Sequence, residues 1–269
     1  FDDVRDRQAL SAAIDREQVV KVAMYDYTYP AHPTGLSDAY AGWRLKTVHG
    51  DQVTIPYEPG RADELLDDAG LPRVRGGQRY DVKGQPLEFE ILVVSGWSDW
   101  VRAAQVIARG LRERGLDVKV KSYDFSAWFD RVQKGDFDLA VGWSVEGPSP
   151  YGFFRWLMSQ KTVKEVGQIA TNNWHRFGSV QVDTLLDQFE KTSKRTEQQE
   201  IVHALQRIMV ESLPAIPLFA NPSWAAFSTA RFTGFPNKTE PYANPSPNAE
   251  PEVLLVLTQL KPKERVTPP

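Results

Sequence analysis

The sequence predicts an α/β fold built around a parallel sheet, and two observations support this prediction. First, residues 87–144 contain three segments with the apolar or alternating pattern of strands: Leu87–Val94, Leu116–Tyr123 and Phe137–Trp143. Second, the segments between them, Val101–Arg114 and Asp124–Lys134, have helical patterns and each ends at a glycine. Strands joined by helices of this length run parallel, with right-handed crossovers.

Tryptophan residues stand where the first and third of these strands end. Ser95-Gly96-Trp97-Ser98-Asp99-Trp100 follows the first strand directly, and Trp143-Ser144 closes the third. In open parallel sheets, ligands bind in the crevice beyond the carboxyl ends of the strands. The pattern therefore predicts a binding site at this edge of the sheet, without by itself predicting catalysis.

The remaining segments are mostly helical, with loops between them. The predicted helices are Val4–Met24 (restarting at Asp15), Arg61–Ala69, Tyr151–Ser159, Val180–Thr192 and Glu197–Ser212, the last capped by Thr196. Tyr25–Pro59 is predicted to be a long ordered loop. Ala215–Ala220, Trp224–Ser228 and Glu252–Leu257 have strand-like composition, and Pro262–Pro269 has the composition of a frayed tail.

Composition excludes several classes of protein. The chain has 269 residues, 41% hydrophobic and 25% charged, which suffices for a sizeable core, and its net charge of −3 gives no reason to expect a nucleic-acid partner. It has no cysteine, which excludes disulfides, cysteine-ligated metal and a thiol nucleophile. The four histidines are far apart without metal-ligand spacing, and we find no GxSxG, P-loop or GxGxxG motif. We expect no metal and no cofactor.

Five segments in order resemble one known family. They are Val4–Arg16 (the vR-A-aidR helix), Tyr57–Gly70 (Y-P-A-LL-AG), Gly135–Leu139 (GDFD), Val182–Leu186 (vD-LL) and Leu213–Leu218 (P-iPL). No single segment is specific, but together they resemble the bacterial extracellular solute-binding proteins of family 5, the capture subunits of ABC importers.

The resemblance implies a fold and a setting. It implies a periplasmic-binding-protein-like lobe with a mainly parallel sheet flanked by helices, matching the C-terminal lobe of the family without its N-terminal lobe. We expect residues 1–218 to form this ligand-binding lobe and residues 219–269 to form a return segment and tail that would pack on the missing lobe. The expected partners are a small-molecule solute, an ABC permease and that N-terminal lobe; the expected location is extracytoplasmic. An isolated lobe is expected to bind ligand weakly, because relatives close two lobes over it.

Two ligand classes fit the resemblance. Peptide-binding members resemble one another in a W-GD-GDPDNF stretch, whose acidic residues anchor the peptide's amino group; here Glu146 alone remains. In contrast, Gly96–Trp100 resembles the GWTDW loop of members that bind β-linked cello- and manno-oligosaccharides. An indole covers the apolar face of a sugar ring, and polar side chains satisfy its hydroxyls. We favour the oligosaccharide class, with an oligopeptide as the alternative. The candidate ligand-binding residues are Trp97, Ser98, Asp99, Trp143, Glu146, Tyr151, Asn172, Asn173 and Trp174.

Other interpretations of these residues stay open. Trp97 could wedge over the following helix, Trp143 and Trp174 could anchor loops, and Asp99 or Ser98 could cap the helix from Trp100. Trp100, and Trp128 with Phe125 and Phe129, are expected to be core residues. A carbohydrate-active hydrolase using Asp99, Glu146 or Asp183 is the alternative of another class, although nothing in the sequence favours it and we expect no enzyme.

Overall fold

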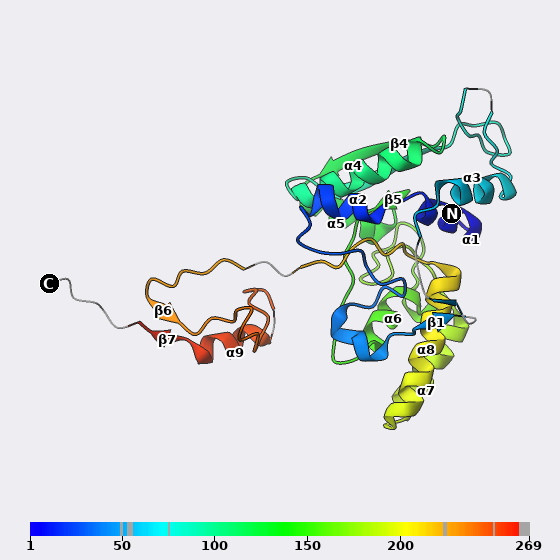
Figure 1. The fold of residues 1–269 in the computed structure, drawn as a ribbon. Helices are drawn as coiled ribbons and strands as arrows, with labels where there is room; N and C mark the ends of the chain where they lie inside the picture. Colours follow the sequence, from blue (N-terminus) through cyan, green and yellow to red (C-terminus); the bar gives the residue numbers. More distant parts are fainter. Residues whose placement is uncertain (49–50, 53–55, 75, 223–224, 250, 264–269) are drawn as a thin grey trace. The chain divides into compact units, whose positions relative to one another are not determined.

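The computed structural model describes residues 1–48, 51–52, 56–74, 76–222, 225–249 and 251–263. The chain divides into two compact units, Phe1–Ala220 and Asn221–Pro269. The elements of the first unit, labelled in Figure 1, are α1 (Val4–Ala12), α2 (Arg16–Ala23), the 3-10 helix η1 (Asp38–Trp43), β1 (Thr47–Val48), β2 (Asp51–Gln52), α3 (Pro59–Asp68), β3 (Glu88–Val94), α4 (Ser98–Arg112), β4 (Asp117–Tyr123), α5 (Phe125–Lys134), β5 (Leu139–Ala140), α6 (Tyr151–Met158), the 3-10 helix η2 (Gln160–Thr162), α7 (Val180–Lys191) and α8 (Arg195–Ser212).

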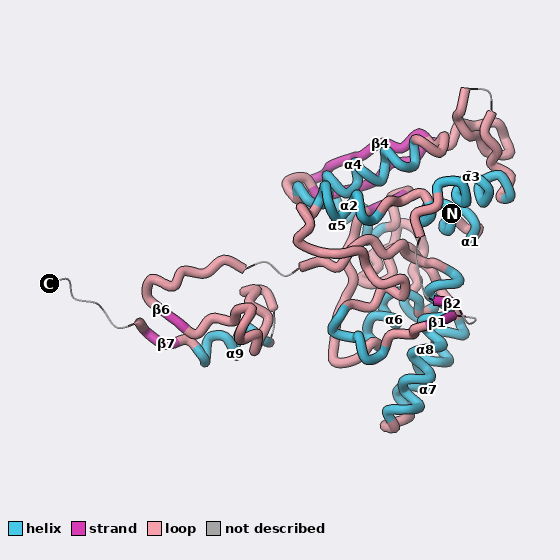
Figure 2. The backbone as a smooth tube through the Cα atoms, viewed as in Figure 1, coloured by secondary structure: helices cyan, strands magenta, loops and turns pink. Residues whose placement is uncertain are grey.

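The sheet at the centre of the first unit has the order β4-β3-β5, and both pairings are parallel. This confirms the predicted α/β class and the strand–helix–strand–helix–strand sequence. Because the chain moves from β3 to β4 and then crosses back to β5, right-handed crossovers place α4 and α5 on opposite faces of the sheet. Helices thus flank the strands, as Figure 2 shows by colour.

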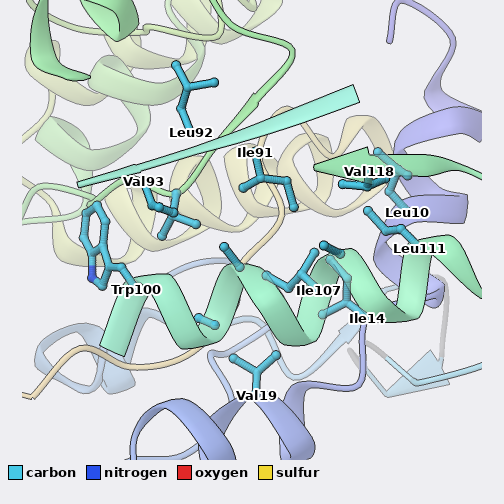
Figure 3. Packing of buried hydrophobic residues seen from close by; sticks show 14 of the residues in the cluster. Leu10, Ile14, Val19, Ile91, Leu92, Val93, Trp100, Ile107, Leu111 and Val118 are labelled. Carbon is cyan, nitrogen blue, oxygen red and sulfur yellow. The ribbon is translucent and has the colours of Figure 1, made fainter. Parts of the chain in front are cut away.

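The main hydrophobic core lies between this sheet and its helices. Ile91 and Val93 of β3 point toward α4, whereas Leu92 points to the other face, which is the alternation expected of a strand (Figure 3). On α4, Ile107 and Leu111 face the strands, and Val19 of α2 packs on the opposite side of α4 (Figure 3). All of these side chains are at least nine-tenths buried. A second core is built by η1, α6, α7 and α8 around Phe154, Met158 and Leu205.

Helices α2 and α5 each follow an aspartate whose side chain caps them. The Asp15 carboxylate accepts a hydrogen bond from the backbone N–H of Gln18 and so restarts the helix as α2. Asp124 caps α5 in the same way through the N–H of Ala127. The predicted cap of α8 is wrong: that helix begins at Arg195, so Thr196 lies within its first turn.

Three strand predictions are wrong in whole or in part. Phe137–Trp143 pairs as a strand only at Leu139–Ala140. In Ala215–Ala220, Pro217 has no N–H for a ladder, and only Phe219 forms an isolated bridge, with Pro30. Ala225–Ser228 forms no strand, and Ser223 and Trp224 lie outside the described residues.

The second unit also differs from prediction. It contains β6 (Phe232–Thr233), α9 (Glu252–Gln259) and β7 (Lys261–Pro262), and β6 pairs antiparallel with β7. The strand predicted at Glu252–Leu257 is therefore wrong. Leucine and glutamate are good helix formers, and no described strand pairs with this segment to favour an extended conformation. Leu254, Leu255 and Leu257 of α9 are more than half exposed.

No helix among the described residues is long and apolar enough to cross a membrane.

Candidate functional site: an aromatic cluster at the strand ends

The turn from β3 into α4 places Trp97 at the carboxyl edge of the sheet. Gly96 has φ +86°, a left-handed conformation that glycine adopts without strain, and it lets the chain reverse directly after Val94. The backbone N–H of Trp97 donates to the carbonyl of Val94, and α4 then begins at Ser98. The Trp97 side chain remains 38% exposed, which is unusual for so large an apolar group.

Beneath Trp97 lies a continuous network of rings, which we call the aromatic cluster. The Trp97 ring meets Trp100 edge-on at a centroid distance of 4.8 Å and lies 6.4 Å from Trp143. Trp100 comes from α4 and Trp128 from α5, and their rings are 6.0 Å apart, so residues from helices on opposite faces meet near the strand ends. The members of the cluster are Trp97, Trp100, Phe125, Trp128, Phe129, Trp143, Trp156 and Trp174.

The cluster is graded from buried to exposed. Trp100 and Trp128 are 5% and 0% exposed, which confirms them as core residues. Trp143, three residues after the end of β5, is half-buried and packs edge-on against Trp174 at a centroid distance of 5.0 Å. Trp174 itself is only 7% exposed and therefore acts as a support for Trp143.

Phe125 is an exposed member of the cluster that sequence reasoning assigned to the core. It is the first residue of α5, directly after the Asp124 cap, and its side chain is 46% exposed at 5.8 Å from the Trp97 ring. The signal in the sequence that indicates an exposed position for Phe125 is its place just after the second predicted strand, at the same sheet edge as Trp97. The exposed apolar surface at this edge therefore consists chiefly of Trp97 and Phe125.

The polar candidates divide between the surface and the interior. Ser98 is exposed and Asp99 half-buried in the first turn of α4. The N-cap position belongs to Trp97, so neither residue caps the helix. Glu146 is exposed in the loop after β5. The Tyr40 hydroxyl accepts a hydrogen bond from the Gly147 N–H (2.6 Å) and donates one to the Gly147 carbonyl (2.9 Å), so it holds the loop beside Glu146.

Asn173 is a structural residue in this lobe. It is fully buried, with φ +53°, and its amide group donates to the carbonyl of Phe177 at 2.6 Å and accepts from the Phe177 N–H at 3.0 Å. The same amide nitrogen reaches Ser159 and Thr162. These bonds use its polar atoms within the loop. Asn172 beside it is half-buried.

Tyr151 belongs to the second core rather than to the aromatic cluster. Its ring packs against Phe189, and its hydroxyl donates to the Glu190 carboxylate at 2.8 Å. Burial, followed by the hydrogen bond to Glu190, raises the pKa of Tyr151 to about 12. Asp183, a candidate acid of the hydrolase alternative, is likewise buried and accepts a hydrogen bond from the Ser159 hydroxyl. These two side chains are engaged within the second core.

A second surface feature lies at the other end of β5. A hollow of about 420 Å³ is lined by charged side chains that include Arg131, Lys134, Asp136 and Asp138, the last two just before β5. Ligands of parallel sheets bind at the opposite, carboxyl edge. Among the described residues, no cluster of three or more His, Cys, Asp or Glu side chains could hold a metal ion.

Known proteins resemble this chain in sequence and in fold. Residues 1–165 match the family described as bacterial extracellular solute-binding proteins, family 5 Middle. Heme-binding protein A of Haemophilus influenzae is 24% identical over 85% of this chain and 38% of its own length. Glutathione-binding protein GsiB of Escherichia coli K12 is 27% identical over 87% of this chain and 42% of its own.

Among solved structures, a mannohexaose-bound periplasmic oligopeptide-binding protein from Thermotoga maritima superposes with a TM-score of 0.87 and 28% identity. It covers 97% of this chain, which in turn spans 50% of that protein. The nonapeptide-bound AppA of Bacillus subtilis, 19% identical with a TM-score of 0.75, shares the fold. The chain thus spans about two fifths of these curated relatives and half of these solved structures.

Proposed function

Since the chain belongs to family 5 of the bacterial extracellular solute-binding proteins, we propose that it is one lobe of the capture subunit of an ABC importer. Residues 1–218 would form the ligand-binding lobe, and residues 219–269 would return to a second lobe. The proposal rests on the chain spanning 50% of a matched solute-binding protein. The same proposal includes an ABC permease as the partner and an extracytoplasmic location. In it, the protein captures its ligand without catalysing a reaction.

The proposed ligand is a β-linked oligosaccharide, and the observation that carries this proposal is the half-exposed indole of Trp97 on a rigid aromatic support. A sugar ring offers an apolar face to an aromatic ring and hydroxyls to its surroundings. Trp97 and Phe125 provide apolar surface, while Ser98, Asp99 and Asn172 are polar groups for the hydroxyls. Trp143 would add a half-buried ring beside Trp97. Trp174 would support Trp143 from behind, and Asn173 would hold the loop that carries Trp174. The mannohexaose-bound relative supports this ligand class.

An oligopeptide is the second candidate, and the exposed Glu146 carboxylate favours it. A peptide's amino terminus is a cation that needs an opposite charge when it is bound away from water. Glu146 lies in a loop that Tyr40 holds in place. Relatives named for glutathione and for di- and tripeptides support this candidate.

One experiment separates the two ligand classes. The two-lobed protein is titrated by calorimetry with cellopentaose, mannotetraose and a tripeptide pool, as wild type and as the Trp97→Ala and Glu146→Gln variants. The expected result is saturable heat with a saccharide, with a Kd that rises about 30-fold in Trp97→Ala and stays near wild type in Glu146→Gln. Binding of peptides alone, lost in Glu146→Gln, would overturn the oligosaccharide proposal.

A further inference from the structure

Three tyrosines follow α2 at alternate positions and remain exposed. Tyr25, Tyr27 and Tyr29 are 63%, 70% and 48% exposed, in a short segment that the proposed ligand site does not use. Large aromatic side chains exposed together indicate an interaction surface, because covering them is favourable. Tyrosine is also enriched where proteins contact one another, since its ring is apolar and its hydroxyl can find a polar partner. The segment is therefore a candidate contact surface.

The beginning of this segment is held in a defined conformation by α2 and α4. Tyr25 and Asp26 have φ values of +50° and +59°, two consecutive non-glycine residues in the left-handed region. Such residues persist only where their surroundings impose the conformation. Arg102 of α4 donates to the carbonyl of Ala23 at the end of α2 (3.0 Å), and its guanidinium lies 4.7 Å from the centre of the Tyr25 ring. The first tyrosine is thus fixed from below by a cation.

The end of the segment pairs with the last residues of the first unit. Pro30 and Phe219 form an antiparallel bridge, and the Ala220 N–H donates to the Tyr29 carbonyl at 3.0 Å. The Thr28 hydroxyl donates to the Ala220 carbonyl. Ala220 is the last residue of the first compact unit. Because the pairing is antiparallel, the chain runs toward the first two tyrosines as it reaches the end of this unit.

The three tyrosines differ in what their hydroxyl groups do. The Tyr29 hydroxyl donates to the Asp38 carboxylate, and this hydrogen bond raises the pKa of Tyr29. Asp38 also forms an ion pair with Arg44 at 2.7 Å. Tyr29 is therefore engaged within the first unit, and Tyr25 and Tyr27 are the most exposed of the three.

We propose that Tyr25 and Tyr27 form the surface of this lobe against which the second lobe of the protein packs. The inference rests on the proposed function, in which the residues after Ala220 lead to a second lobe, and it names where the lobes touch. That lobe would account for the other half of the matched solute-binding protein, of which this chain spans 50%. Surface next to the crossing of the chain moves least when two lobes hinge. The tyrosines are therefore covered even without ligand.

The test compares the nitration of single tyrosines by tetranitromethane in this chain and in the two-lobed protein, both without ligand and both followed by peptide mass spectrometry. Tyr25 and Tyr27 are expected to react about fivefold more slowly in the two-lobed protein, because a packed interface excludes the reagent. Tyr57, 45% exposed before α3, is the matched control and should react equally in both proteins. Tyr29 is not a readout, since its raised pKa itself slows nitration.

The control tyrosine lies away from the proposed contact. Tyr57 precedes Pro59, whose carbonyl accepts from Arg114 just beyond the end of α4 (3.5 Å), whereas Tyr25 contacts Arg102 in the first half of α4. Oxidation by hydroxyl radicals is the second measurement. It does not depend on ionisation of the phenol, so the same pattern of shielding is expected if the rings are covered, and a pattern confined to nitration would overturn the contact.

The results distinguish this contact from the function on which it rests. If Tyr25 and Tyr27 react equally in both proteins, the contact is wrong, and capture of a saccharide or peptide by the two-lobed protein leaves the proposed function standing. If both are shielded and no ligand binds, the contact stands and the capture function is wrong. Slower reaction of both than of Tyr57 in this chain alone would also overturn the contact, because no second lobe is there to cover them.

Discussion

Replacing Trp97 by alanine tests the stacking argument most directly. The side chain is 38% exposed. A tryptophan presents up to ~250 Å², so roughly 95 Å² of indole can be covered by a ligand. At ~25 cal/mol per Å², covering that surface stabilises the complex by about 2 kcal/mol. We therefore expect Trp97→Ala to raise the Kd for the preferred oligosaccharide about 30-fold.

Calorimetry is the suitable assay, because the variant removes a fluorophore. The matched control is Trp128→Phe, which changes a fully buried ring of the same cluster. It is expected to lower the free energy of unfolding by about 1–3 kcal/mol through the cavity it leaves, while the Kd of the folded protein stays near wild type. The stacking argument is refuted if Trp97→Ala binds within twofold of wild type, or if Trp128→Phe weakens binding as much as Trp97→Ala does.

Three further predictions concern the support of the site and the stability of the lobe. Tyr40→Phe removes both hydrogen bonds to Gly147, so we expect about 1 kcal/mol lower stability by urea unfolding and, if Glu146 contacts the ligand, a Kd raised several-fold by calorimetry. Burial lowers the pKa of His175 to about 4. The ring therefore stays neutral in the folded protein, whereas the unfolded chain takes up a proton near pH ~6.5. The free energy of unfolding should accordingly fall by about 2–3 kcal/mol as the pH drops from ~6.5 to ~4, which urea unfolding at each pH measures. Arg79 is fully buried and pairs with two carboxylates, so Arg79→Met should cost about 3 kcal/mol in urea unfolding, against less than ~1 kcal/mol for the half-exposed Arg73→Met.

Each of these three predictions has an outcome that contradicts it. For Tyr40, unchanged stability and unchanged Kd would mean that water replaces both hydrogen bonds. For His175, the variant His175→Gln should show a smaller loss of stability between pH 7 and pH 4.5 than wild type, and equal losses would assign the acid sensitivity to other groups. For Arg79, a cost no greater than that of the Arg73 control would show that its ion pairs do not stabilise the native state.

Local signals predicted the sheet and most of its helices. The periodicity of β3 and β4, the Asp15 cap and the glycines that follow α4 and α5 each act within a few residues, and the structure confirms the elements they predict. Failures occur where pairing partners decide the outcome. Glu252–Leu257 has the composition of a strand, yet no strand among the described residues pairs with it, and the same leucines form α9.

The candidate site was harder to predict because exposure is a property of the tertiary packing. Phe125 and Trp128 lie three residues apart on the same helix, yet Phe125 is 46% exposed and Trp128 is fully buried. The amide of Asn173 is of a type that suits a sugar hydroxyl, but here it makes four hydrogen bonds inside the protein, to Ser159, Thr162 and Phe177. Residue type indicated which groups could contact a ligand, and only packing separates those that face solvent from those that hold the loop.

The edge-to-face packing below Trp97 has a kinetic consequence. Trp100, 5% exposed, meets the Trp97 ring at 87° and 4.8 Å, so the indole has few rotamers available before any ligand arrives. The entropy of ordering that side chain is therefore lost during folding and not during association. A preorganised surface of this kind leaves the encounter rate largely unchanged when contacts are removed. Variants of its rings should accordingly differ in how long the complex survives, not in how fast it forms.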